Sequence, residues 1–132
     1  MEFCFTRQAP APGGHYSQAV IHGDLVFVSG QLPIDPGTGR MIEAGIEAQV
    51  ERVIDHVESI LLAAGSRLDQ VLKSTVFITD ITHWPAVNAV YARRFGDHRP
   101  ARAIIPCGPL HHGALLEMDV IAARLAQAAI TD

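Results

Sequence analysis

The segment that most constrains the fold is residues 43–64, which carry the spacing of an amphipathic helix. Apolar side chains recur there at intervals of three and four residues, while charged side chains occupy the opposite face. The apolar stripe consists of Ile46, Val50, Val53, Ile54, Val57, Ile60, Leu61 and Ala64. Gly65 follows the stripe and favours a helix end at that point. A stripe of this width must pack against another element, so the sequence predicts a helix lying on a layer of strands.

Segments typical of β-strands lie on both sides of this helix. The runs SQAVI and DLVFVSG flank the dipeptide HG, a pattern that predicts a β-hairpin within residues 17–30. The run VLKSTVFITD predicts a strand over residues 71–80, and another is expected over residues 101–107. In the final run, ALLEMDVIAARL, apolar and acidic residues alternate, so Leu116 and Glu117 are expected on opposite faces of one strand.

A second, shorter helix is expected after Thr82, which serves as its N-cap, with Pro85 in its first turn and Gly96 at its end. Its inner side is predicted to carry Val87, Val90, Tyr91 and Trp84. The resulting order, β-β-α-β-α-β-β, is typical of an α+β domain in which a mostly antiparallel sheet carries two helices packed on one face. The length of 132 residues fits a single domain over residues 1–132.

Composition indicates that this domain buries part of its surface against other copies of itself. Hydrophobic residues make up 48% of the chain and charged residues 18%, an apolar balance for a small domain. The strand LVFVSG is apolar at nearly every position, so both of its faces are expected to be covered. Because the helices occupy one face of the sheet, self-association is the expected cover for the other.

Charge and cysteine content exclude several classes of function. The net charge of −4 argues against nucleic-acid binding, which relies on basic surfaces. No apolar run approaches the roughly 20 residues of a membrane span, and the N-terminal segment lacks the pattern of a signal peptide. Cys4 and Cys107 lie far apart and form no metal-binding motif. We therefore expect a cytoplasmic protein that holds no metal ion.

Two charged residues stand out as candidates for chemistry. Arg102 lies in RPARAIIPCGP, residues 99–109, a run that otherwise reads as buried. A buried guanidinium needs either a carboxylate partner or an anionic ligand. Glu117, within LLEMDVI, could form an ion pair with Arg102 or could orient a reacting water. Asp119 has the same strand parity as Glu117, and spacing alone leaves these alternatives open.

Other polar positions carry weaker signals. Tyr16 follows a glycine-rich segment and could present its hydroxyl to a ligand, and Asn88 on the second helix could face either way. His111 and His112 are adjacent and lack a third ligand at a recognisable spacing, so we expect solvated side chains in a turn. Cys107 is expected to be a small buried side chain rather than a nucleophile.

Several segments together resemble the Rid family, also called YjgF, of reactive-intermediate deaminases. They are APGGHYSQAV, VFVSGQLPIDPGTG, AQVERVIDHVESILLAAGSRLDQVLKSTVFITDI, VNAVYARRF, RPARAIIP and LLEMDVIAA. These segments occur in the order and spacing of the family and span about residues 9–125. The combination of SGQLPID, VLKSTVFITD, VNAVY and RPAR makes the resemblance specific.

The resemblance implies a chorismate-mutase-like fold. It also implies a homotrimer whose sheets line a central barrel, with three clefts between subunits. Arg102, in the PAR motif, would bind the carboxylate of the substrate, and Glu117 would help to hold the attacking water. Tyr16 and Gly30 match residues that line the cleft.

The reaction implied by the resemblance is hydrolysis of an enamine or imine such as 2-aminoacrylate or 2-iminopropanoate to a 2-oxo acid and ammonia. The imine is already electrophilic, so no metal or organic cofactor is needed. Asn88 and Ile104 would complete the substrate pocket, where many family members have cysteine in place of Ile104. Three alternatives are a different enamine such as 2-aminomuconate, an endoribonuclease activity, and a non-catalytic ligand-binding trimer.

Overall fold

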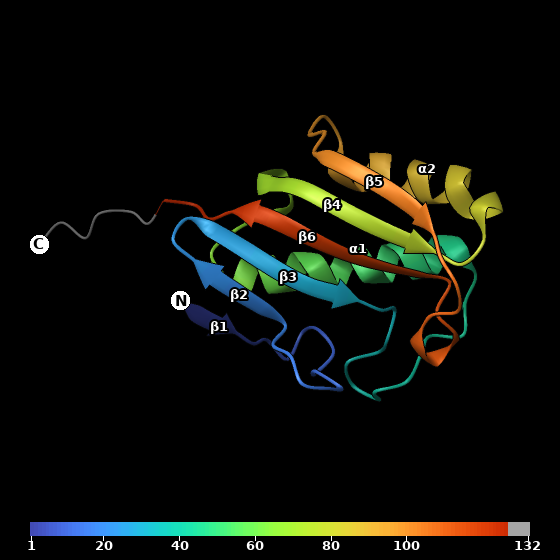
Figure 1. The fold of residues 1–132 in the computed structure, drawn as a ribbon, viewed down its shortest axis with the longest axis horizontal. Helices are drawn as coiled ribbons and strands as arrows, with labels where there is room; N and C mark the ends of the chain where they lie inside the picture. Colours follow the sequence, from blue (N-terminus) through green and yellow to red (C-terminus); the bar gives the residue numbers. More distant parts are fainter. Residues whose placement is uncertain (127–132) are drawn as a thin grey trace, which may run out of the picture.

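In a computed structural model, which describes residues 1–126, six strands form one sheet and two helices cover one of its faces (Figure 1). The strands are β1 (Glu2–Cys4), β2 (Ala19–His22), β3 (Leu25–Gln31), β4 (Val71–Ile78), β5 (Ala101–Pro106) and β6 (Leu116–Ala123). The helices are α1 (Ile46–Ala63) and α2 (Trp84–Phe95), with short 3-10 turns at Leu68–Gln70, Ile81–His83 and His111–Gly113. The predicted α+β class, with both helices on one face of the sheet, is confirmed.

The sheet has the strand order β1-β2-β3-β6-β4-β5. Neighbouring strands are antiparallel except β4 and β5, which run parallel and are connected through α2. A parallel connection needs a crossover, and α2 supplies it on the helical face beside β5. The prediction that the segment around Arg102 is buried is wrong, because β5 is an edge strand whose residues are exposed or half-buried. β1, which has no counterpart among the predicted strands, forms the opposite edge.

The core lies between α1 and the middle of the sheet. α1 begins at Ile46, three residues later than predicted, and its apolar stripe is buried as expected. The side chains of this stripe without any exposed surface are those of Val53, Ile54, Val57, Ile60 and Leu61. β6 alternates as predicted, with Leu116, Met118 and Val120 buried on the helical face. Glu117 therefore points to the other face of the sheet.

The start of α2 differs from the prediction. Thr82 does not cap it, because Thr82 lies inside the 3-10 turn Ile81–His83 that precedes α2. Asp80 caps this turn, since its carboxylate accepts hydrogen bonds from the Thr82 backbone N–H at 2.9 Å and from the Thr82 hydroxyl at 2.7 Å. α2 itself follows His83 without a side-chain cap. Pro85 lies in the first turn of α2, and Gly96, with a φ of 62°, follows its last residue, as predicted. Trp84 is 39% exposed rather than inward-facing, because it is the first residue of α2 and lies near the edge strand β5.

The second face of the sheet is open within the chain, on the side toward the viewer in Figure 1. Val26 and Val28 of β3 are buried, but Phe27 between them is 41% exposed on the open face. Ile121 of β6 lies opposite Phe27, so both belong to one apolar surface. Residues 1–126 of one chain therefore do not cover both faces of this strand. None of the helices in the same range is long and apolar enough to cross a membrane.

Candidate active site

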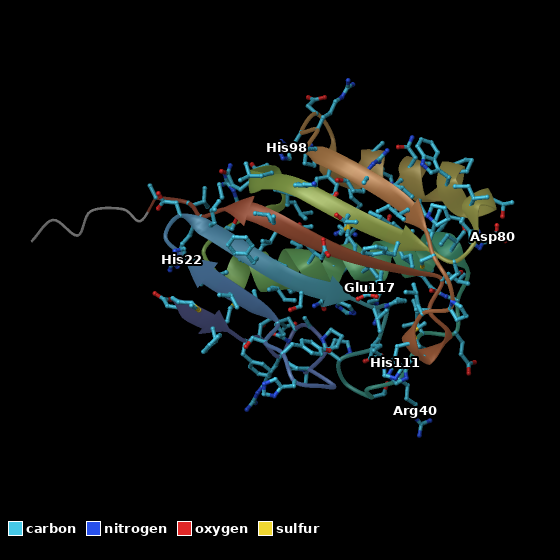
Figure 2. All side chains as sticks on the ribbon, viewed as in Figure 1. His22, Arg40, Asp80, His98, His111 and Glu117 are labelled. Carbon is cyan, nitrogen blue, oxygen red and sulfur yellow. The ribbon has the colours of Figure 1, made fainter. Side chains whose placement is uncertain are left out.

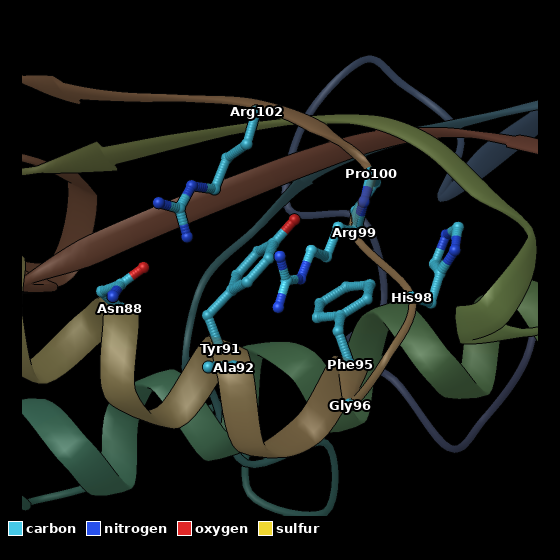
Figure 3. A pocket seen from close by; sticks show the side chains of 9 residues that line it. All are labelled: Asn88, Tyr91, Ala92, Phe95, Gly96, His98, Arg99, Pro100 and Arg102. Carbon is cyan, nitrogen blue, oxygen red and sulfur yellow. The ribbon is translucent and has the colours of Figure 1, made fainter.

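Arg102 lies on β5 with its side chain directed toward α2 (Figure 3). In the parallel pair β4–β5, Arg102 is opposite Ser74, whose hydroxyl hydrogen-bonds with the Tyr91 hydroxyl of α2 at 2.6 Å. The guanidinium carbon of Arg102 lies 4.7 Å from the centre of the Tyr91 ring and 5.7 Å from that of Trp84. Cation–π attraction to these two rings therefore favours this position of the guanidinium.

A cavity of about 510 Å³, here named the Arg102 cavity, lies between α2 and β5. Its lining comprises Asn88, Tyr91, Ala92, Phe95, Gly96, His98, Arg99, Pro100 and Arg102. None of these residues is acidic, and no ion pair within 4.0 Å among residues 1–126 involves Arg102. The chain therefore does not form the ion pair between Arg102 and Glu117 that the sequence left open. The guanidinium is available for an anionic ligand.

Glu117 lies on β6 opposite Phe77 of β4, with its carboxylate against Gly30 of β3. The pairing of β3 with β6 shifts register between Val28 and Gln31, which marks an irregularity at this point of the strand. A Cβ atom at Gly30 would lie 2.9 Å from the carboxyl carbon of Glu117, so the absence of a side chain leaves room for this acid. Figure 2 shows Glu117 among the side chains on the ribbon.

The acids of β6 have perturbed proton affinities. Burial raises the pKa of the Glu117 carboxyl, and the negative charge of Asp119 raises it further. Burial also raises the pKa of Asp119, although a hydrogen bond with the Thr75 backbone and the charge of Lys73 oppose that effect. A carboxylate whose pKa lies above its usual range is a stronger base, so Glu117 is suited to accepting a proton from water.

A second concave region, of about 580 Å³, is named the Tyr16 hollow. It is lined by Pro10, Ala11, Gly13, Gly14, Tyr16, Gly30, Gln31, Leu32, Ile34, Pro36, Gly39, His111 and His112. Tyr16 is 53% exposed, and its hydroxyl accepts a hydrogen bond from the Gly13 N–H at 3.2 Å. His111 and His112 are exposed in a 3-10 turn, as expected, and their rings stack with centres 3.9 Å apart.

Arg102 and Glu117 lie on opposite faces of the sheet. Arg102 is opposite Ser74 and Glu117 is opposite Phe77, and positions 74 and 77 of one strand point in opposite directions. The Arg102 cavity, to which Asn88 contributes, is therefore on the helical face, whereas Glu117 lies beside the Tyr16 hollow on the other side. A single chain does not bring the predicted site residues together.

The remaining candidates have other surroundings. Ile104 packs against the hydrophobic core and is not part of the cavity lining. Cys107 is half-buried. Tyr91 is 6% exposed, as expected of a core residue, but its ring also lies beneath Arg102.

Arg99 also lines the Arg102 cavity, and its place in RPAR was the only signal for it in the sequence. Within residues 1–126 no three His, Cys, Asp or Glu side chains are grouped to hold a metal ion.

Comparison with known proteins shows to which family the chain belongs. The model of the endoribonuclease L-PSP family, which includes the Rid proteins, matches residues 6–124. The crystal structure of RidA from an Antarctic Psychrobacter superposes with a TM-score of 0.90 at 36% identity, covering 93% of this chain and 99% of that one. The chain belongs to the Rid family. Its sheet and helices are therefore those of the Rid fold, and the resemblance seen in the sequence is confirmed.

Curated relatives of this Rid chain have names of different precision. A RutC family protein of Pyrococcus abyssi is 42% identical over 121 residues, which cover 92% of this chain and 95% of that protein. The goat protein named 2-iminobutanoate/2-iminopropanoate deaminase is 37% identical over 119 residues, covering 90% of this chain and 87% of the goat protein. The relatives of this Rid chain thus include a protein that is named as an imine deaminase.

Proposed function

We propose that this Rid protein hydrolyses 2-imino acids, formed from enamines such as 2-aminoacrylate, to 2-oxo acids and ammonia. The observation that carries the proposal is the Arg102 guanidinium, which lines a cavity without any acidic residue. A guanidinium in such a place favours a carboxylate ligand, which it can bind through two parallel hydrogen bonds. The goat relative, named as a deaminase of two such imino acids, supports the same substrate class.

Binding of the carboxylate positions the reacting carbon. In a 2-imino acid the C=N carbon is bonded directly to the carboxylate carbon, so Arg102 fixes both at once. Water adds to the C=N carbon, and the proton that it loses passes through Glu117 to the nitrogen, which gives a carbinolamine. The hydroxyl proton of the carbinolamine then moves to the nitrogen as the C–N bond breaks and the C=O bond forms, which releases ammonia and the 2-oxo acid. Glu117 orients this water and accepts its proton, a role that its raised pKa favours. The electrophile is the imine itself, so the proposed reaction uses no cofactor.

The site is proposed to form between two copies of the chain in a homotrimer. Arg102 and Glu117 lie on opposite faces of the sheet, so they can act on one substrate only if they come from different subunits. In this arrangement the Arg102 cavity of one subunit faces the Tyr16 hollow and Glu117 of its neighbour. The exposed apolar surface around Phe27 supports such an assembly, because its burial between subunits is favourable.

The other site residues have supporting roles in this proposal. The Asn88 amide lines the Arg102 cavity and can donate a hydrogen bond to the substrate, and the Tyr16 hydroxyl can do so from the neighbouring subunit. Gly30 leaves space for Glu117. Ile104 packs on the core, so its contribution is restricted to the backbone of β5, which has a strand neighbour on one side only. We also propose a cytoplasmic location, where free thiols remain reduced.

The test is a competition between enzymatic hydrolysis and chemical trapping. An amino-acid oxidase generates 2-iminopropanoate from alanine, and semicarbazide traps it as a product that absorbs in the ultraviolet. The parent protein should slow formation of the trapped product, because it hydrolyses the imine before semicarbazide reacts with it. Arg102→Gln should lower kcat/KM about a hundredfold, because it removes a charged bidentate contact. Arg67→Gln, which removes the same charge at an exposed position outside both concave regions, is the matched control.

Three results would count against the proposal or a part of it. Unchanged trapping in the presence of the parent protein would show that it does not hydrolyse this imine. Binding of pyruvate, measured by calorimetry, without any hydrolysis would instead identify a ligand-binding protein. Equal activity of Arg102→Gln and Arg67→Gln would remove the role assigned to Arg102.

A further inference from the structure

Two guanidinium groups line the Arg102 cavity. Arg99 and Arg102 both contribute to its wall, and no acidic side chain does so (Figure 3). The nearby acids of α1 are engaged elsewhere, since Glu51 and Asp55 form their ion pairs with Arg93 and Arg94 of α2. No ion pair within 4.0 Å among residues 1–126 involves Arg99. The cavity thus carries two positive charges that the described part of the chain does not neutralise.

The backbone that carries Arg99 is held on both sides. Gly96, with a φ of 62°, turns the chain away from α2, and the His98 ring hydrogen-bonds through Nε2 to the Val71 carbonyl at 2.7 Å. Pro100 then restricts the backbone just before β5 begins. Figure 3 shows the Arg99 side chain in the view between the rings of Tyr91 and Phe95. Arg99 therefore extends into the cavity from a short loop between α2 and β5 that is anchored through His98.

Charge and volume together favour a ligand with two anionic groups. Each guanidinium can bind one carboxylate in a bidentate manner, and like charges in one cavity repel each other until an anion binds. The carboxylate beside the reacting carbon is assigned to Arg102, which leaves Arg99 for a second one. The cavity volume of about 510 Å³ exceeds what a three-carbon imino acid needs and accommodates a longer chain.

We propose that Arg99 binds a second carboxylate and that the preferred substrates are therefore 2-imino dicarboxylic acids. This inference rests on the proposed function and specifies its substrate class. The side-chain carboxylate of an acid such as 2-iminoglutarate would extend from the reacting carbon toward Arg99, while Arg102 holds the carboxylate at the other end. Hydrolysis is the same as for the monocarboxylic imine, with one water consumed and one ammonia released.

The experiment compares two imines that an amino-acid oxidase generates from alanine and from glutamate. The measured quantity is the ratio of kcat/KM for 2-iminoglutarate to that for 2-iminopropanoate, from which any general loss of folded protein cancels. Arg99→Gln should lower this ratio about tenfold or more, and Arg99→Lys should lower it less, because lysine keeps the charge without the fork. Arg67→Gln should leave both rates unchanged. An equal ratio in the parent and Arg99→Gln would overturn the inference.

Binding measurements separate this inference from the proposed function. Calorimetry with 2-oxoglutarate and with pyruvate reports the dicarboxylate preference without turnover. If the parent hydrolyses neither imine but binds 2-oxoglutarate more tightly, and Arg99→Gln removes that difference, the function fails while the dicarboxylate site stands. If the parent hydrolyses 2-iminopropanoate and neither readout responds to Arg99→Gln, the function stands and the dicarboxylate site is wrong.

Discussion

Tyr91 combines two separate contributions in one side chain. Its hydroxyl hydrogen-bonds with the buried Ser74 at 2.6 Å, and its ring lies 4.7 Å from the guanidinium carbon of Arg102. Burial raises the pKa of the Tyr91 hydroxyl, while the Ser74 hydrogen bond and the Arg102 charge oppose that effect only in part. The phenol therefore stays neutral at physiological pH. Its structural role and its support of the proposed ligand-binding guanidinium meet in this residue, and substitutions can separate them.

Tyr91→Phe should destabilise the protein while retaining more activity than Tyr91→Leu. Loss of the hydroxyl leaves the buried Ser74 without this partner, which should cost about 1–2 kcal/mol in the free energy of unfolding. The ring remains under Arg102 in Tyr91→Phe and is lost in Tyr91→Leu, which should lower kcat/KM about fivefold further. Denaturant titration and imine hydrolysis measure the two effects. Equal activity of the two variants would show that the ring does not support Arg102.

The pH dependence of hydrolysis should report the charge of Asp119. Burial and then the Asp119 charge raise the pKa of Glu117, and the proposed base is the ionised form. Activity should therefore fall as the pH drops through this raised pKa. Asp119→Asn removes one of the two causes, so the acid limb of kcat/KM should move to lower pH. Rates relative to the parent at each pH cancel the pH dependence of the imine itself. Asp69→Asn, on the surface, should leave the acid limb in place, and an unmoved limb in Asp119→Asn would contradict the prediction.

At the scale of elements, the irregular end of β3 determines where Glu117 lies. Gly30→Ala would place a methyl group against the Glu117 carboxylate, which is the mobile end of its side chain and can move away. We expect kcat/KM to fall about tenfold while the melting temperature changes by only about 1–2 °C. Gly108→Ala is the control, since a Cβ there meets nothing within 4 Å. A Gly30→Ala protein with full activity would show that the position of this carboxylate is unimportant.

Elements with a strong internal pattern were predictable, and those defined by their neighbours were not. The stripe of α1 and the alternation of β6 are properties of the segments themselves, and both were found as predicted. The short strand β1 pairs with β2 through only three residues of its own and has no such pattern. The segment around Arg102 has the apolar composition of a buried strand but lies at an edge, because strand order depends on tertiary pairing. Trp84 is exposed for a similar reason, because it lies near this edge strand.

The candidate site shows the same division. Arg102 and Glu117 were identified as charged residues in apolar surroundings. That they lie on opposite faces of the sheet follows only from the way in which β5 and β6 pair with β4. Arg99 was missed because, apart from its place in RPAR, an exposed arginine in a loop has no distinctive local pattern. The proximity of these residues to one another, which the proposed chemistry requires, depends on strand pairing within the chain and on the proposed contacts between chains.

At the scale of the whole molecule, the proposed division of the site between subunits predicts complementation between inactive variants. Arg102→Gln and Glu117→Gln should each be inactive alone. When equal amounts are unfolded together and refolded, about a quarter of the clefts in a randomly mixed trimer should pair an intact Arg102 with an intact Glu117. Recovery of about a quarter of the parent activity is therefore expected. A mixture that remains inactive, although light scattering shows that mixed oligomers form, would contradict a site shared between subunits.

The position of the two charged residues on opposite faces of one sheet has a consequence for how activity responds to dilution. If each site needs two copies, an isolated subunit has no turnover, and specific activity follows the fraction of chains that are assembled. The rate per chain should therefore fall when the protein is diluted below the dissociation constant of the assembly, and it should recover when inactive Glu117→Gln subunits are added as partners. Measuring initial rates across a dilution series beside sedimentation velocity would test this coupling. In a cell, a change in the amount of this protein would then change the proposed rate of imine hydrolysis by a larger factor.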